Sequence, residues 1–401
     1  LGGLLYGHLP ERLRAGSAED ARGGAPALRL GVWIVVLGLL SPASVLAARL
    51  ARLALGVPAG ELVGLSGLVG GAVISIVPFA VVGGLFFAMA ISAMATRERI
   101  GSRAVGSAYV IESAGAVAGG VAMSFVFLRW LDPMSTAFML TALCAAASLR
   151  LALPARRAGA EPRCGDDSRE RAGDDHRRPQ GRGRSRRARA AASGVILVLA
   201  CAIAATPLGE TIDDLTVEAQ WKELGFRSHA NSIYGRVVTT ELGSQKSVYQ
   251  SGVLAASRPD RMSAEETVHI PMLQHASPHR ILLVGGCLGG AVEEILKHPT
   301  VTHVDCVELD PMIVREATRV FGGSMAEGLD DPRVTLSYGD ARFFVKRAAA
   351  EPRRGGYDVA IVSVPDPTTA RLNRFYPREC AGELRACLAD GGVVGLPLSS
   401  A

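Results

Sequence analysis

The sequence has few aromatic residues and no closely paired cysteines, and both absences restrict its class. Aromatic side chains make up 5% of the 401 residues. None of them interrupts the arginine-rich run near the middle of the chain, which argues against RNA as a partner. The seven cysteines are scattered, without a CxxC pair or a histidine at ligand spacing. We therefore expect reduced thiols, no disulfide framework, no metal site and no nucleic acid partner.

Long stretches lack charge altogether, which excludes a purely soluble chain. The run 62–96 contains no charged residue, and at 1.5 Å per residue it would be about 50 Å long. That length exceeds the ~30 Å hydrocarbon core of a bilayer, so we expect two short passes or one tilted helix kinked near Pro78. The sequence predicts about five or six membrane segments, with the others at 28–53, 104–128, 135–153 and 195–208.

Composition divides the chain into segments of different character. Residues 1–154 are assigned to multi-pass membrane helices. Residues 155–192 are arginine-rich and nearly free of large apolar side chains, so we expect a disordered cytoplasmic linker. A membrane or interfacial helix at 193–209, a small β subdomain at 210–262 and a Rossmann-like domain at 263–401 follow. The chain begins without Met and stops at Ala401, just after the strand-like run 393–398, so we expect a fragment whose Rossmann-like domain is truncated at its C-terminus. No cleavable signal peptide is visible.

Arginine-rich segments set the expected orientation in the membrane. Residues 11–22, 97–103 and 156–189 carry such clusters, and the positive-inside rule places all of them in the cytoplasm. If 195–208 then crossed the bilayer, the second half of the chain would lie outside. We expect an integral protein of a bacterial inner membrane with its catalytic domain in the cytoplasm, and either an incomplete crossing at 195–208 or a hairpin upstream.

A strand, a glycine turn and a helix follow one another after residue 280. The buried-strand run 281–284 leads into a loop of sequence Gly-Gly-Cys-Leu-Gly-Gly, and a helical pattern comes next. Glycines let a backbone approach a ligand, and a helix N-terminus offers free N–H groups, so the loop is a candidate nucleotide cradle. The candidate cofactor-binding residues here are Gly285, Gly286, Leu288 and Gly289.

Acidic residues follow the second and third strands of this pattern. Glu308 ends a strand about 20 residues after the loop, where an acid accepts hydrogen bonds from ribose hydroxyls. Asp310 is instead a candidate cap of the next helix. Asp340 and Ala341 follow the third strand, where a carboxylate can accept a hydrogen bond from the adenine amine. The pattern predicts an α/β domain of the methyltransferase type that binds S-adenosylmethionine or its decarboxylated form. The alternative is an α/β domain with ordinary helix caps.

Residues 232–400 resemble the spermidine synthase family, the polyamine aminopropyltransferases, and more narrowly its members fused to multi-pass membrane helices. The family's Gly-Gly-Gly-Asp-Gly loop is similar to the glycine loop here. Further similar elements are the helix with His269 and Pro271, the acidic strand end 307–310, the Asp-Pro-Arg at 331–333, the Gly-Asp-Ala at 339–341 and the Tyr-Asp-Val strand at 357–361. The resemblance implies that Glu308 holds the ribose and Asp340 the adenine of decarboxylated S-adenosylmethionine.

The sequence departs from the family pattern at the positions that carry the family's catalytic and substrate-binding residues. The family's fourth strand ends in Asp-x-x-Asp-Pro, and its first Asp is the base that deprotonates the attacking amine. Here Ser363 and Asp366 occupy the two positions, and both are our catalytic candidates. Leu288 replaces the loop Asp that contacts the aminopropyl chain. A Tyr-His-Glu element retains only Glu265, which we group with Tyr234 and Asp366 as candidates for binding the substrate. The amine is protonated near neutral pH and general-base help is worth roughly 10²- to 10⁴-fold, so binding is better supported than catalysis.

Three functions remain open at this point. The first is a membrane-anchored aminopropyltransferase that moves the aminopropyl group of decarboxylated S-adenosylmethionine onto a diamine such as putrescine. The second is a methyltransferase-like enzyme that uses S-adenosylmethionine, since one fold serves both chemistries. The third is a non-catalytic membrane sensor or transporter-like protein with an adenosyl-ligand-binding domain. Expected partners are a polyamine or other amine and membrane lipid, and a homodimer is kept as an alternative to a monomer.

Overall fold

The computed structural model describes residues 25–61, 63–95, 101–153, 181–350, 356–365, 367 and 370–397. The chain forms two compact units. One comprises Leu1–Gly56 and Val63–Val217, and the other comprises Val57–Leu62 and Glu218–Ala401. Asp366 and residues 1–24 and 155–180 of the predicted segments lie outside the described residues.

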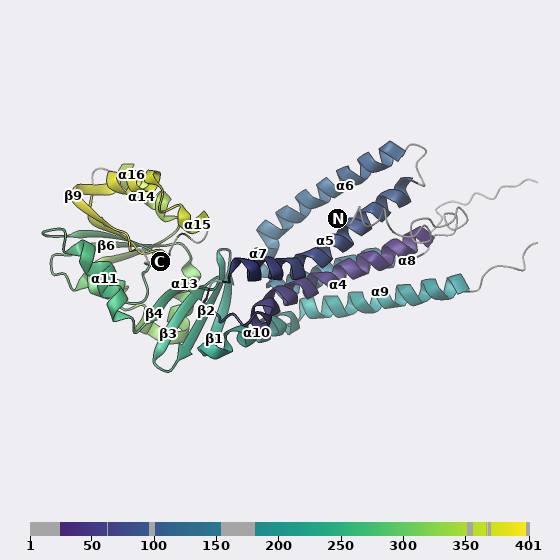
Figure 1. The fold of residues 1–401 in the computed structure, drawn as a ribbon, viewed down its shortest axis with the longest axis horizontal. Helices are drawn as coiled ribbons and strands as arrows, with labels where there is room; N and C mark the ends of the chain where they lie inside the picture. Colours follow the sequence, from purple (N-terminus) through teal and green to yellow (C-terminus); the bar gives the residue numbers. More distant parts are fainter. Residues whose placement is uncertain are drawn as a thin grey trace, which may run out of the picture. The chain divides into compact units, whose positions relative to one another are not determined.

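The first unit is helical (Figure 1). Its described elements are α4 (Ala25–Ala54), α5 (Leu65–Ala95), α6 (Gly101–Ala122), a π-helical turn (Met123–Phe127), α7 (Leu128–Trp130), α8 (Pro133–Ala152), α9 (Gly181–Ala205) and the start of α10 (Leu208–Trp221). Among the described residues, five stretches are long and apolar enough to cross a membrane: Arg29–Ala54, Leu65–Met94, Val105–Trp130, Pro133–Ala152 and Arg186–Ala205. The predicted run 62–96 contains a single helix, α5, with Pro78 inside it.

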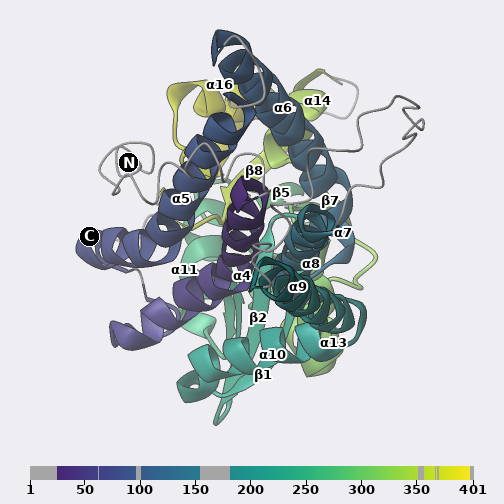
Figure 2. The ribbon, with the colours of Figure 1, turned by 90° about the vertical axis from the view of Figure 1, so that its right-hand side faces the viewer.

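Helix α8 packs against both α4 and α9 (Figures 1 and 2). Small residues make the approach close, as is usual where helices pack in lipid. A Cβ placed on Gly38 would lie 2.7 Å from the Cys144 Cβ, and the Thr141 hydroxyl donates to the Gly38 carbonyl at 2.8 Å. The side chain of Asp132 begins α8 by accepting backbone N–H bonds from its first turn.

The expected disordered linker is wrong where it overlaps α9, because residues 181–192 are helical. Arginine and alanine are good helix formers, so this arginine-rich segment continues the helix of the apolar run behind it. Arg186 Nε also donates to the carbonyl of Ala152 at 2.7 Å. Helix α10 likewise occupies the beginning of the predicted β subdomain. Its Asp213 forms an ion pair with Arg49, which also donates to Thr216 at 2.6 Å.

The second unit begins with an antiparallel sheet, as the strand pattern predicted. Its strands are β1 (Phe226–Ser232), β2 (Gly235–Leu242), β3 (Gln245–Gln250) and β4 (Val253–Arg258), paired in sequence order. They follow a short 3₁₀ turn at Lys222–Leu224. This sheet matters for the site because β1 and β3 contribute side chains that hold an acidic residue of the following domain.

The rest of the unit is an α/β domain with a parallel sheet of order β7-β6-β5-β8-β9. Its elements are α11 (Arg261–Met272), β5 (Arg280–Val284), α12 (Ala291–Leu296), β6 (His303–Glu308), α13 (Pro311–Phe321), a 3₁₀ turn (Gly322–Met325), β7 (Val334–Tyr338), α14 (Ala341–Ala350), β8 (Tyr357–Val362), α15 (Ala370–Asn373), α16 (Arg378–Cys387) and β9 (Leu388–Gly395). Strand order reverses between β5 and β8, and open sheets of this kind bind ligands at such a switch point.

Helices cover both faces of the parallel sheet. Helices α11, α12 and α13 pack on one face and α14 and α16 on the other (Figure 1). The packing of strand β5 explains why its sequence is apolar throughout. Ile281 and Leu283 belong to one core cluster, while Leu282 and Val284 belong to the other. The predicted fold class, apolar helices followed by a small β sheet and a Rossmann-like domain, is confirmed.

Candidate functional site

The glycine loop connects β5 to α12 at the switch point. Gly285, Gly286, Gly289 and Gly290 all have φ between 64° and 113°, a region that other residues rarely adopt. A Cβ on Gly285 would lie 2.7 Å from the Ser363 carbonyl oxygen, and one on Gly286 would lie 2.7 Å from the Ser363 Cβ. The loop therefore requires glycine both for its backbone angles and for its contact with the end of β8.

The side chains of the loop's two larger residues are buried in the core. Leu288 is 5% exposed and Cys287 is 2% exposed, and both belong to the core cluster beneath the loop. Leu288 could therefore offer only backbone atoms to a ligand. Burial raises the pKa of the Cys287 thiol, which donates toward Glu308 Oε2 at 3.6 Å. The loop supplies backbone groups and no side-chain charge.

Glu308 ends β6 as a nearly buried carboxylate, 9% exposed. Its Oε1 accepts the backbone N–H groups of Leu309 at 2.9 Å and Asp310 at 3.4 Å. Among the described residues, its Oε2 has only the long contact with the Cys287 thiol. Burial raises the pKa of Glu308, and this outweighs the backbone hydrogen bonds that lower it. Glu308 thus combines an incompletely satisfied oxygen with the edge position where a ribose would bind.

Asp310 is part of the scaffold. It is 1% exposed, and its Oδ1 caps α13 by accepting the Met312 N–H at 3.0 Å. Its Oδ2 accepts the Ser232 hydroxyl at 2.5 Å and the Gln250 amide at 2.7 Å, which ties β1 and β3 to the end of β6. Tyr234, half-buried in the β1–β2 turn, donates its backbone N–H to Ser232 at 3.1 Å. This link places the predicted substrate residue Tyr234 near the carboxyl edge of the sheet.

Asp340 follows β7 and has two sets of partners. Its Oδ1 accepts the N–H groups of Arg342 at 2.9 Å and Phe343 at 3.4 Å, which caps α14. Its Oδ2 accepts Arg374 Nη1 at 2.6 Å. Burial alone would raise the pKa of Asp340, but Arg374 and the helix N–H groups outweigh it and lower the pKa. Ala341, the first residue of α14, is buried. Sequence reasoning missed Arg374, because one arginine among many carries no positional signal.

The remaining candidates come from β8 and α11. Ser363 directly follows β8 and donates its backbone N–H to the Val284 carbonyl at 2.9 Å. Glu265 is half-buried in α11. The neighbouring Ala264 has its Cβ 3.5 Å from where a Cβ of Gly290 would stand, so this helix borders the end of the loop. The structure thus brings the glycine loop, Glu308 and Ser363 to one edge of the sheet.

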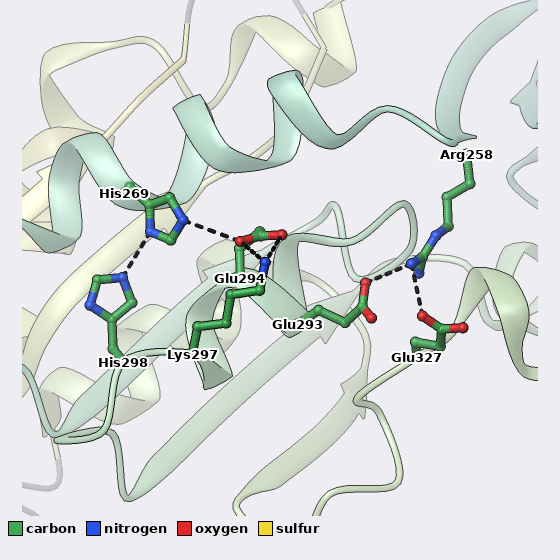
Figure 3. Close-up of polar contacts among 7 residues, drawn as sticks. All are labelled: Arg258, His269, Glu293, Glu294, Lys297, His298 and Glu327. Carbon is green, nitrogen blue, oxygen red and sulfur yellow. Dashed lines mark hydrogen bonds and ion pairs between the residues drawn. The ribbon is translucent and has the colours of Figure 1, made fainter.

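An arginine anchors the helix that follows the loop (Figure 3). Arg258, the last residue of β4, donates through Nη2 to Glu293 at 2.6 Å and to Glu327 at 2.8 Å. Glu293 belongs to the first turn of α12. The network therefore joins the antiparallel sheet to α12 and to the segment before β7, and it holds the loop from one side.

Two histidines and a lysine anchor the other side of α12 (Figure 3). Glu294 faces His269 at 3.2 Å and accepts two bonds from Lys297 at 2.6 Å. His269 Nδ1 lies 2.9 Å from His298 Nε2. Burial would raise the pKa of Glu294, but Lys297 and His269 lower it overall. Burial, and secondarily His269, lowers the pKa of His298. Among the described residues, no cluster of three or more histidine, cysteine or acidic side chains could hold a metal ion.

A parallel α/β sheet with a glycine loop after one central strand and acids after the next two defines a Rossmann-like nucleotide-binding domain. Residues 261–397 match the family model of the spermine/spermidine synthase domain. Similar curated proteins include the spermidine synthase of Dictyostelium discoideum, 39% identical over 144 residues, or 36% of this chain and 48% of that protein. The polyamine aminopropyltransferase of Bacillus subtilis (strain 168) is 35% identical over 156 residues, or 39% of this chain and 54% of that protein.

A spermidine synthase in complex with the transition state analogue AdoDATO matches at 25% identity and a TM-score of 0.38, covering 42% of this chain and 57% of that chain. The chain spans about half the length of the curated relatives it matches. The resemblance to the spermidine synthase family that was stated from the sequence is confirmed for this part of the chain: residues 261–397 match the domain model, and the similar curated proteins are spermidine synthases and polyamine aminopropyltransferases. The narrower resemblance to members fused to membrane helices stays a prediction.

Proposed function

We propose that this chain is a membrane-anchored, spermidine synthase-like aminopropyltransferase. It would transfer the aminopropyl group of decarboxylated S-adenosylmethionine to a diamine such as putrescine, with its catalytic domain in the cytoplasm. The observation that carries the proposal is the meeting of the glycine loop, Glu308 and Ser363 at the switch point of a domain that matches the spermine/spermidine synthase model.

Donor binding would rest first on Glu308. Its Oε2 has no strong partner among the described residues, so it is available to a ribose hydroxyl. Asp340 would accept the adenine amine only after Arg374 gives up its bond to Oδ2. The backbone of Gly285, Gly286 and Gly289 would allow the sulfonium end of the donor to approach the sheet edge closely.

The transfer forms a bond from the acceptor nitrogen to a carbon of the aminopropyl chain and breaks that carbon's bond to sulfur. The acceptor amine must be neutral to attack, whereas a free amine is protonated near neutral pH. Ser363 lies at the end of β8 and cannot remove the proton unaided. We assign proton removal to a carboxylate, with Asp366 and Glu265 as the candidates, and we assign Ser363 the role of a hydrogen-bonding residue.

One observation favours a second function. Because the Leu288 side chain is buried in the core, the loop has no acid that would prefer the cationic, decarboxylated donor over zwitterionic S-adenosylmethionine. A methyltransferase-like enzyme that uses S-adenosylmethionine is therefore the alternative.

Calorimetric titration of the full chain in detergent micelles separates the two functions. The titrants are S-adenosylmethionine, its decarboxylated form and then putrescine, followed by mass spectrometry of the reaction products. Tighter binding of the decarboxylated donor, with aminopropylated product, is expected. Tighter binding of S-adenosylmethionine without that product would support the alternative, and binding of neither donor would contradict both.

A further inference from the structure

Helix α8 runs antiparallel to both α4 and α9, and the three helices meet at one end of their bundle. The start of α4 lies against the end of α8, because a Cβ on Gly31 would be 3.1 Å from the Ser148 hydroxyl. The end of α8 lies against the start of α9, because the hydroxyls of Ser148 and Ser193 are 3.0 Å apart. The first residues of α4 and α9 and the last residues of α8 therefore share one end.

A cavity of about 190 Å³ opens between these helix ends. Its wall is mostly apolar, and Val32, Val35 and Val36 of α4 face Ile196 of α9 across it. The serine hydroxyls of the wall are bonded to each other. A cavity with this lining holds hydrocarbon more readily than water, because water needs polar partners that this wall does not offer.

Arginines are concentrated near the helix ends that form the cavity. Arg189 contributes to its lining and its side chain is exposed. Arg150 lies in the last turn of α8, and Arg29, Arg186 and Arg187 lie within the first two turns of α4 and α9. These helix ends contain no Asp or Glu. The acidic groups of the bundle lie elsewhere: for example, Asp132 caps the opposite end of α8.

We propose that this cavity binds one anionic phospholipid, with an acyl chain against the valines of α4 and the phosphate on Arg189. A phospholipid fits because it joins hydrocarbon to a phosphate, matching an apolar wall with a cationic rim. Basic pockets between membrane helices are a recurrent way to hold anionic head groups. The proposal rests on the helices spanning a membrane and is independent of the proposed transferase activity.

Native mass spectrometry of the full chain tests the site. The protein is exchanged into detergent with equal amounts of phosphatidylglycerol and phosphatidylcholine that carry identical acyl chains. We expect one phosphatidylglycerol to be retained preferentially, with about tenfold weaker retention in Arg189→Gln, because the charge-assisted bond to phosphate is lost. Ala192→Phe, which fills the cavity without removing charge, should also reduce retention.

Arg187→Gln is the matched control. It removes the same charge from the same exposed helix end, but Arg187 does not line the cavity, so retention should change little. Equal losses in Arg187→Gln and Arg189→Gln would overturn the proposal in favour of diffuse surface attraction. Equal retention of the two lipids by the unaltered chain, or full retention by Ala192→Phe, would overturn it as well. Circular dichroism of each variant checks that the helices remain folded.

Discussion

Replacing Glu308 with glutamine should weaken donor binding while leaving the fold at least as stable. The substitution keeps the shape of the side chain and removes its charge. Oε1 is already held by two backbone N–H groups, so only Oε2 is available to a ribose hydroxyl. A hydrogen bond to a charged group is worth about 1.5–3 kcal/mol, which corresponds to a roughly 10- to 150-fold rise in the Kd of the donor.

The pH dependence of stability gives this prediction a second signature. Burial raises the pKa of Glu308. A raised pKa in the folded state means that the side chain's contribution to stability is complete below the unfolded pKa, about 4.3 for glutamate. That contribution is lost as pH rises through the folded pKa. Relative to the wild type, the Tm of Glu308→Gln should therefore rise as pH increases from about 4.3 toward neutrality.

Glu316 provides a matched control of opposite sign. It is also a buried glutamate, 6% exposed, but it bonds to Arg319 and Ser228. Burial would raise its pKa, and these partners lower it overall. Glu316→Gln should therefore lose stability near neutral pH and bind the donor normally. Differential scanning fluorimetry and calorimetric titration measure both quantities. Unchanged donor affinity in Glu308→Gln, together with a lower Tm throughout the pH range, would refute the assignment of Glu308 to the ligand.

Three further predictions concern the scaffold, the chemistry and pH. Asp310→Ala should lower the free energy of unfolding by about 3–5 kcal/mol, because a helix cap and two side-chain hydrogen bonds are lost together. Urea denaturation measures this loss, and a change below about 1 kcal/mol would contradict the scaffold role of Asp310. Ser363→Asp should raise aminopropyl transfer to putrescine by up to roughly 10²- to 10⁴-fold, and no rise in product would count against a base at this position. Because the pKa of His298 is lowered, its contribution to stability is present above about pH 6.5 and is lost as pH falls. His298→Gln should therefore reduce the fall in Tm between about pH 7 and pH 5. An unchanged slope of Tm against pH would exclude His298 as the source of that fall.

The parallel sheet could be predicted because its signals are local. The fully apolar run 281–284 is what a strand buried on both faces requires, and the glycine loop and the next helix follow within a few residues. The long apolar helices could be predicted equally well, since length and apolar content alone decide whether a helix can span a bilayer. The start of α9 could not be predicted, because an arginine-rich composition fits both a disordered segment and a solvated helix end.

Contacts between distant segments could not be predicted from the sequence. Arg374 reaches Asp340 from 34 residues away, and Arg258 reaches Glu327 from 69 residues away. Neither arginine differs from its neighbours in any local pattern. The sequence located the acids at the strand ends, and the folded structure determined which of them had partners.

That difference in partners separates three acids that the sequence alone ranks almost equally. Asp310 has three strong bonds and belongs to the scaffold. Asp340 has an ion pair that a ligand would have to displace. Glu308 keeps an oxygen with only a thiol at 3.6 Å, and its burial disfavours the charge that it would use in binding. A buried carboxylate that lacks a strong partner contributes more to ligand binding than to the stability of the fold. The affinity for an adenosyl ligand should therefore depend more on Glu308 than on Asp310 or Asp340.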